Sequence, residues 1–170
     1  MAYHDNVWGK PVYDDKKLFE FLNLEGAQAG LNWYNVLIRV ESYEKAFDGW
    51  NINKIRKYTD KDRNRLVNDK GIIRNKLKIN SVITNAKAYH ELSKEKSLSD
   101  FLWDYVDGKP IVNKPKTMDD VPAQTPLSLQ ISKDLKKRGF KFVGPTIMYA
   151  FMQAVGMVND HLVSCDFRNA

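Results

Sequence analysis

The stretch LKKRGFKFVGPT, residues 135–146, is the part of the chain that decides the predicted fold. It joins two amphipathic segments through a short connection that has a glycine at each end, Gly139 and Gly144. The spacing of these glycines superficially fits the phosphate loop of nucleotide hydrolases. That interpretation fails because Pro145 stands where the loop needs its lysine, and because a helix rather than a strand is predicted before it. The stretch instead predicts a helix-hairpin-helix that covers about residues 126–156.

A hairpin of this kind has the chemistry to hold an anion. Its glycines let the backbone approach a ligand closely, and the N–H groups that begin the second helix lack helical partners. The helix dipole favours negative charge at the same place. Basic side chains surround the connection: Lys136, Lys137, Arg138 and Lys141. We favour contact with a DNA phosphate, which positions a duplex without reading its bases, over an ordinary interhelical turn with a solvated basic rim.

Helical periodicity dominates the rest of the chain. Apolar residues recur three or four apart in residues 15–29, which Gly30 ends, and in a second helix that Asn32 caps and that runs to Phe47. Further helices are expected at 74–92, after Ser97, at 126–139 after the cap Thr125, and at 145–156, with Pro126 and Pro145 as first residues and Ile147 on the core side. Asn53 is another expected cap, Thr59 and Asp62 resemble a capping box, and residues 109–125 are expected to form a loop. No stretch alternates cleanly between apolar and polar residues, so no sheet is expected. The predicted fold class is all-α, with a compact helical fold.

Length and composition exclude several classes of protein. A chain of 170 residues with 43% apolar residues suits one domain, residues 1–170, that buries roughly 70% of its unfolded surface. Cys165 is the single cysteine, so a disulfide scaffold is excluded and a reducing cytoplasm is the expected location. No apolar run approaches the ~20 residues that a membrane span needs, and the N-terminal residues do not resemble a signal peptide. A soluble globular protein is expected.

The charge is unevenly distributed along the chain. The 27 Lys and Arg residues exceed the 21 Asp and Glu residues and give a formal net charge of +6. Residues 54–80 contain 10 basic and 3 acidic side chains, and residues 131–170 contain 6 and 3. These two blocks would attract a polyanion if the fold brings them to one face. Solvation of exposed helix faces explains the same composition equally well.

Five stretches of the sequence, followed by Cys165, resemble the 3-methyladenine DNA glycosylase I family, which belongs to the helix-hairpin-helix superfamily of base-excision glycosylases. The resemblance covers nearly the whole chain, from Ala2 to about Cys165, with the motifs in order and at similar spacing. The stretches are AYHDNVWG (2–9), LFEFLNLEGAQAGLNW (18–33), GIIRNKLKI (71–79), FLWDYVDGKP (101–110) and LKKRGFKFVGPTIMYAFMQAVGMVNDH (135–161); the last of these includes both the hairpin and the segment that follows it.

The resemblance implies a base-binding pocket. Glu25 matches the carboxylate that hydrogen-bonds the edge of the methylated adenine, and it is the residue to which we assign a catalytic role. Trp33 and Tyr3 match residues that stack on or contact that base, with Trp8 in the pocket wall. Leu31 matches the residue that fills the gap left by the flipped nucleotide.

Taken without the family, these residues have plainer interpretations. Glu25 lies among apolar neighbours on a stripe that faces the core, and carboxylates are seldom buried without a partner, which favours a cleft over a plain surface position. Trp33, Tyr3 and Trp8 would by default be core aromatics. Leu31 alone is unremarkable.

The resemblance also implies a structural zinc ion. His4, His161 and Cys165 match three of the family's four ligands, whereas the fourth, a cysteine upstream of AYHD, has no counterpart because Met1 stands there. A truncated start, three ligands plus water, and an empty site remain open. Without the family, His4 would be a surface or capping residue. The pair His161 and Cys165 shares a helical face but is weak evidence for a metal.

The hairpin residues Gly139, Lys141 and Gly144 resemble the family's DNA-backbone clamp. Many members of the wider superfamily carry a catalytic aspartate where this chain has Asn159, and bifunctional members carry a lysine near Pro145. The lack of both groups agrees with 3-methyladenine DNA glycosylase I and makes a Schiff-base lyase an unfavoured interpretation.

The implied activity is a monofunctional glycosylase that flips 3-methyladenine out of double-stranded DNA and hydrolyses its N-glycosidic bond. Alkylated duplex DNA is then the expected partner of a monomer, without an obligate protein partner or a membrane. The alternative is a non-catalytic helix-hairpin-helix DNA-binding module. A metal-dependent hydrolase that uses His4, His161 and Cys165 is a third, less favoured interpretation.

Overall fold

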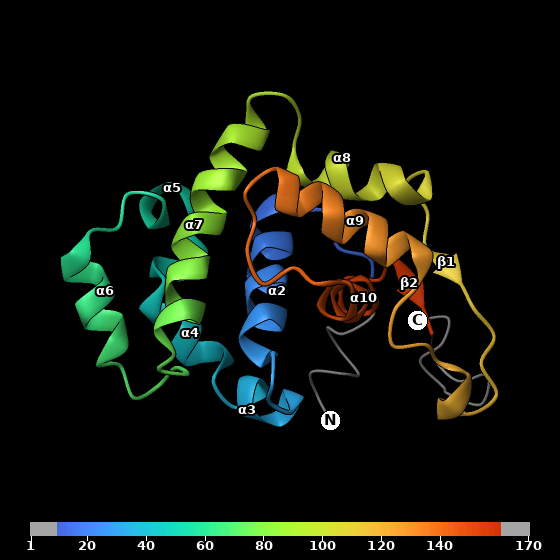
Figure 1. Cartoon of the computed structure of the whole chain (residues 1–170), viewed down its shortest axis with the longest axis horizontal. Coiled ribbons are helices and arrows are strands. Elements are labelled where there is room, and N and C mark those ends of the chain that lie inside the picture. Colours follow the sequence, from blue (N-terminus) through green and yellow to red (C-terminus); the bar gives the residue numbers. More distant parts are fainter. Residues whose placement is uncertain (1–9, 161–170) are drawn as a thin grey trace.

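A computed structural model describes residues 10–160 of the chain. Helices make up most of these residues, and a single pair of two-residue strands is the only sheet within them (Figure 1). The all-α prediction is therefore confirmed. None of the helices in the described part of the chain is both long enough and apolar enough to span a membrane.

Helix α2, Asp15–Gln28, lies at the centre of the fold, with α7, α8 and α10 packed around it (Figure 1). The side chain of Asp14 caps its start by accepting a hydrogen bond from the N–H of Lys17 (3.0 Å). The helix ends as predicted, because Gly30 adopts a positive φ of 79° just after the C-cap Ala29. Nearly every residue from Leu18 to Ala27 is buried, so α2 is a core helix.

The predicted single helix after Asn32 is wrong, because the structure contains two helices there. They are α3, Trp33–Leu37, and α4, Val40–Ala46. Asn32 caps α3 as expected, by accepting a hydrogen bond from the N–H of Asn35 (3.1 Å). The break lies at Arg39. Its guanidinium donates a hydrogen bond to the carbonyl of Asn35 (2.6 Å), which is the acceptor that its backbone N–H would use in a continuous α-helix. That N–H donates to the carbonyl of Val36 instead (2.9 Å).

The next elements are the 3₁₀ turn η1, Asp48–Trp50, and the helices α5, Ile52–Ile55, and α6, Asp60–Val67. The predicted cap Asn53 is wrong, since the side chain of Asn51 accepts from the N–H of Lys54 (3.1 Å) and the helix begins one residue later. The capping box of Thr59 and Asp62 is confirmed.

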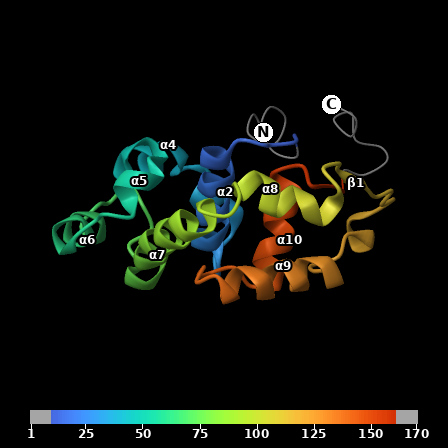
Figure 2. The same cartoon turned by 90° about the horizontal axis from the view of Figure 1, so that it is seen from above.

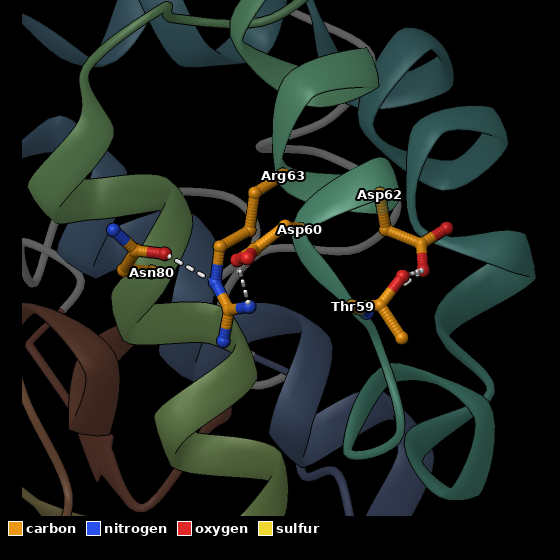
Figure 3. Close-up of polar contacts among 5 residues, drawn as sticks. All are labelled: Thr59, Asp60, Asp62, Arg63 and Asn80. Atoms are coloured by element: carbon orange, nitrogen blue, oxygen red, sulfur yellow. Dashed lines mark hydrogen bonds and ion pairs between the residues drawn. The ribbon is translucent and has the colours of Figure 1, made fainter.

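Helix α6 is joined to α7, Lys76–Ser93, through Arg63 (Figure 3). The Nε of Arg63 donates to Oδ1 of Asn80 (2.9 Å), and its Nη1 donates to Oδ1 of Asp60 (3.1 Å). Figure 3 shows this arginine between the two helices, with the Thr59–Asp62 pair on the other side of α6. These contacts are largely exposed, so they orient α6 more than they stabilise it.

Asp15 ties α2 to α7 and to α8, Leu98–Trp103. Its carboxylate accepts hydrogen bonds from the hydroxyl of Tyr89 (2.6 Å) and from the backbone N–H groups of Leu98 (3.2 Å) and Ser99 (2.8 Å). Ser97 caps α8 as predicted, and the 3₁₀ turn η2, Asp104–Val106, follows.

The predicted loop at 109–125 contains two short elements, the strand β1, Ile111–Val112, and the 3₁₀ turn η3, Met118–Asp120. Strand β1 pairs in parallel with β2, Val158–Asn159, so the expectation of no sheet is wrong here. Two residues are too few to show an alternating pattern, which explains why the sequence does not reveal the strands.

The last two helices are α9, Pro126–Lys137, and α10, Pro145–Ala154. They pack against each other, and α10 also packs against α2. Figure 2 shows α9 running across the lower end of α10, with α2 beside α10. Thr125 caps α9, and proline is the first residue of each helix, as the sequence predicts. One hydrophobic core joins α10 to α2, α7 and α8.

Candidate functional site

A pocket of about 320 Å³ lies between the end of α2 and the start of α10. Its volume is at the lower end of the range for small-molecule sites. The wall on one side is the last turn of α2 and the residues that follow it, and the wall on the other side is the first two turns of α10. The described lining residues are Glu25, Gln28, Ala29, Gly30, Leu31, Thr146, Ile147 and Ala150.

Glu25 is the only acidic side chain among the described residues that line this pocket. Its exposed fraction is 4%, and within residues 10–160 no hydrogen-bond donor or cation offsets its burial. Burial raises the pKa of the Glu25 carboxyl to about 8. An unpartnered carboxyl in a cavity is costly to the fold, and such groups cluster at functional sites.

Glu25 is positioned by the close approach of α2 to residues 138–144, the α9–α10 connection. A Cβ atom on Gly26, the next residue, would lie 3.1 Å from Cβ of Phe142 and 3.3 Å from its carbonyl oxygen. Glycine at 26 therefore lets the connection pack directly on α2. The pocket and the connection are parts of one packed unit.

The α9–α10 connection has a defined backbone. Gly139 has a φ of 92°, and the N–H groups of Gly139 and Phe140 donate to the carbonyls of Lys136 (3.0 Å) and Leu135 (3.1 Å). This pair of hydrogen bonds is the Schellman motif. The motif provides hydrogen-bond donors for two carbonyl groups in the last turn of α9 and turns the chain toward α10.

Asn85 of α7 holds the middle of the connection. Its Oδ1 accepts from the N–H of Lys141 (2.7 Å), while its Nδ2 donates to the carbonyl of Lys141 (3.2 Å) and to Oδ1 of Asn23 (3.0 Å). Asn23 and Asn85 are both buried, and Asn23 is anchored to the carbonyl of Phe19 (2.8 Å). This network fixes the connection relative to α2 and leaves the side chain of Lys141 exposed.

Gly144 differs from Gly139, because nothing in its backbone requires glycine. Its φ is −60°, and a Cβ atom there would have no heavy atom within 4 Å. It is the N-cap residue of α10, and Thr146, two residues later, lines the pocket. The open space at Gly144 is what the approach of a ligand backbone would need.

The structure brings some of the predicted site residues together. Glu25 and Leu31 line the same pocket, and Leu31 is 41% exposed at its rim. Trp33 begins α3, two residues beyond Leu31, and is half-buried against the core; it is not among the described residues that line the pocket. Gly139, Lys141 and Gly144 lie in or beside the adjoining connection. The remaining predicted site residues, Tyr3, His4, Trp8, His161 and Cys165, lie outside the described residues.

Sequence reasoning missed the α10 wall of the pocket. Ala150 lies four residues after Thr146 and three after Ile147, so the three side chains lie on one side of α10. Ile147 looked like an ordinary core residue from its spacing, and it is only half-buried. The signal was present as periodicity, but the sequence does not say that this face meets the end of α2.

Comparisons with known proteins agree with these findings. The family model described as methyladenine glycosylase matches residues 1–169. DNA-3-methyladenine glycosylase 1 of Escherichia coli (strain K12) is 48% identical over 166 residues, which are 97% of this chain and 89% of that protein. The corresponding glycosylase of Haemophilus influenzae (strain ATCC 51907 / DSM 11121 / KW20 / Rd) is 48% identical over 97% of this chain and 90% of its own length.

Solved structures are similar over the same extent. A crystal structure of 3-methyladenine DNA glycosylase I has a TM-score of 0.95 and 46% identity, and the match covers 97% of this chain and 91% of that one. A structure on 3-methyladenine recognition by the Staphylococcus aureus enzyme has a TM-score of 0.96 and 37% identity, with 99% and 90% covered.

Proposed function

The chain belongs to the methyladenine glycosylase family, and we propose that the pocket at Glu25 is the place where it receives the damaged base. It is a 3-methyladenine DNA glycosylase, an enzyme that hydrolyses the N-glycosidic bond between the alkylated base and deoxyribose. The observation that carries the proposed site is the buried carboxyl of Glu25, which has no compensating partner within residues 10–160.

In this proposal, the positive charge of the alkylated base lets the Glu25 carboxyl distinguish it from adenine. Methylation at N3 places a positive charge on the adenine of the nucleotide, whereas an undamaged adenine is neutral. A cation that enters the pocket supplies a partner that residues 10–160 do not offer Glu25, so binding of the damaged base stabilises the carboxylate. The pocket therefore favours the alkylated base over adenine.

The base reaches the pocket by leaving the duplex, which costs a few kcal/mol. Leu31 is exposed at the rim, and in this proposal it fills the gap that the nucleotide leaves. Trp33 is proposed to contact the base, where a cation gains roughly 0.5–2 kcal/mol over an aromatic face. Tyr3 and Trp8 are proposed to complete the binding surface.

Hydrolysis requires little acid catalysis, because the alkylated base already carries the charge that it loses on departure. The N-glycosidic bond breaks with its electron pair moving to the base, which leaves neutral. Water adds to the sugar carbon and releases one proton. Glu25 is proposed to stabilise the positive charge in the pocket until the bond breaks. No lysine stands at Pro145 or Thr146, so we propose hydrolysis without a lyase step.

The α9–α10 connection is proposed to hold the DNA backbone as a helix-hairpin-helix. Gly144 leaves open space, and α10 begins there with N–H groups suited to a phosphate. Changing the three exposed lysines Lys136, Lys137 and Lys141 to glutamate should weaken binding to all DNA sequences alike and reduce the salt dependence. A salt dependence identical to that of the wild type would place the DNA contact on another face.

Zinc bound by His4, His161 and Cys165 is proposed as a structural feature of the chain. Within residues 10–160 no group of three or more His, Cys, Asp or Glu side chains could hold a metal ion, so the described part offers no competing site. A thiolate and two imidazoles suit zinc. Metal analysis of the purified protein, compared with Cys165→Ser, tests this.

One assay separates the proposed function from a DNA-binding module without catalysis. The protein is incubated with methylated duplex DNA, with and without a chelator, and the released bases are separated and identified. Free 3-methyladenine in both samples supports the proposal. Binding without release supports the module, and release that the chelator abolishes points to a requirement for metal.

A further inference from the structure

Lys78 links two helices at the rim of the Glu25 pocket. It lies in the first turn of α7, and its Nζ donates hydrogen bonds to the carbonyl oxygens of Ala27 (2.9 Å) and Ala29 (2.5 Å). Ala27 is in the last turn of α2 and Ala29 is its C-cap, and that turn contains no basic residue of its own. The cation that a helix C-terminus favours therefore comes from a different helix.

The carbonyl groups at the end of α2 accept hydrogen bonds from two sources, the local backbone and the side chain of Lys78. The carbonyl of Gln28 accepts from the N–H of Leu31 (2.7 Å), which closes the turn. The carbonyls of Ala27 and Ala29, on either side, face the ammonium of Lys78. Two of the three donors of that ammonium are thus used on one turn. Partial burial lowers the pKa of the Lys78 amine, because desolvation disfavours its charged form.

The turn that Lys78 holds is also a wall of the pocket. Gln28, Ala29, Gly30 and Leu31 all line it, and Gly30 has the positive φ that brings Leu31 to the rim. The position of this turn decides both the width of the pocket mouth and the direction in which Leu31 extends. A shift there would move the residue proposed to replace the flipped base.

We propose that Lys78 is a positioning residue for base extrusion: it fixes the Ala27–Leu31 turn so that Leu31 enters the duplex as the base enters the pocket. The proposal rests on the proposed function and deepens it. It also gives a role to the stretch at 71–79, whose resemblance to the family has no explanation in base binding. Lys78 acts through the turn and does not itself contact the base.

The test compares Lys78→Met with Lys78→Arg and with Lys76→Met. Lys76 is a matched control, because it loses the same charge two residues away, on the exposed start of the same helix. Excision from methylated duplex DNA is measured under single-turnover conditions at saturating enzyme. Extrusion is followed by the fluorescence of 2-aminopurine at the target position, and the Kd for undamaged duplex is measured separately.

For Lys78→Met we expect a roughly tenfold lower single-turnover rate and a weaker 2-aminopurine signal, with the Kd for undamaged duplex within about twofold of wild type. Lys78→Arg, which retains donors and charge, should recover most of the rate. Lys76→Met should match the wild type. If Lys78→Met does not fold, as judged by thermal unfolding, Lys78→Gln replaces it with the same expectations.

Two results would overturn the positioning role. One is a wild-type rate and fluorescence signal for Lys78→Met, and the other is an equal loss for Lys76→Met, which would mean that only charge near the DNA matters. Failure of the proposed function is distinguishable from both, since the wild-type protein would then release no 3-methyladenine in the same assay.

Discussion

Two buried carboxyl groups in this protein are treated in opposite ways. Glu25 and Asp160 are 4% and 7% exposed. Asp160 accepts hydrogen bonds from the hydroxyl of Tyr149, from Nδ2 of Asn113 (2.5 Å) and from Nε2 of Gln153 (3.0 Å). Glu25 has no such partner within residues 10–160. Glu25 and Asp160 are therefore buried to a similar extent but differ in their hydrogen bonding.

The two carboxyl groups differ in what their burial costs the fold, because one is hydrogen-bonded and the other has no partner within residues 10–160. The cluster around Asp160 joins α10 to the residues that directly follow β1 and β2. Burial, together with the hydrogen bond to Asp160, raises the pKa of the Tyr149 hydroxyl. A satisfied polar network of this kind specifies structure. The Glu25 carboxyl lines a pocket and has no such partner within residues 10–160, which is costly to the fold. In the proposed function, a bound cationic base supplies the partner.

Of the substitutions at these two carboxyl groups, the one that removes the charge of Glu25 should have the largest effect, and the effect should be on the excision rate. Glu25→Gln keeps the volume of the side chain but cannot pair with a cation, so excision of 3-methyladenine should fall at least tenfold, about 1.4 kcal/mol or more of transition-state stabilisation. Trp33→Ala should produce a comparable loss. Single-turnover release of the base measures both.

Glu20→Gln is a matched control for this change, since Glu20 is on the same helix and is only half-buried. Its excision rate should stay close to that of the wild type. Wild-type excision by both Glu25→Gln and Trp33→Ala would remove the assigned site.

The mirror change, Asp160→Asn, should act on stability. It places an amide where Asn113 and Gln153 both donate, so at least one half-buried donor loses its acceptor, at a cost of about 1–2 kcal/mol. Urea unfolding measures the loss, and Asp104→Asn, an exposed carboxylate, should change stability by less than about 0.5 kcal/mol. An unchanged midpoint for Asp160→Asn would mean that the cluster does not hold the fold.

The raised pKa of the Glu25 carboxyl predicts that the stability of the protein depends on pH. The carboxyl holds its proton in the folded state up to about pH 8 and loses it near 4.5 when unfolded. The unfolded state therefore binds fewer protons between these values, and the free energy of unfolding falls by roughly 1.4 kcal/mol per pH unit as the pH rises.

Glu25→Gln should make this dependence weaker. The free energy of unfolding of the variant, relative to that of the wild type, should therefore rise from pH 5 to pH 8. Urea unfolding at several pH values gives both slopes. Parallel slopes for the two proteins would show that the carboxyl titrates in its ordinary range.

The smallest effect is expected for Tyr149→Phe. It removes one of the three donors to Asp160 and leaves the other two, so the loss should be about 1 kcal/mol. Thermal unfolding measures it, with excision per folded molecule as the second readout. A large loss of excision at full stability would give the Asp160 cluster a part in the reaction.

Local signals predicted most element boundaries. Asn32, Ser97, Thr125 and Gly139 act through residues next to them in the sequence, so their capping roles can be inferred without the fold. The break at Arg39 was missed because a side chain competes there for a backbone carbonyl, which periodicity does not reveal.

The site was only partly predictable, for a related reason. Glu25 stands out in the sequence as a carboxylate on an apolar stripe, and its assignment came from the resemblance to the family. The α10 wall of its pocket lies more than a hundred residues later in the chain, so no local pattern connects that wall with Glu25. Lys78 gave no signal, because its hydrogen bonds join residues 51 and 49 positions apart.

Titration of the Glu25 carboxyl carbon by NMR, assigned by comparison with Glu25→Gln, is the most direct measurement. We expect a pKa of about 8 in the free protein. The pKa should fall when an uncleavable duplex with a cationic base analogue is bound, because the cation stabilises the carboxylate. A carboxyl that titrates near 4.5 in the free protein, or a pKa that the cation does not change, would contradict the proposed role of Glu25.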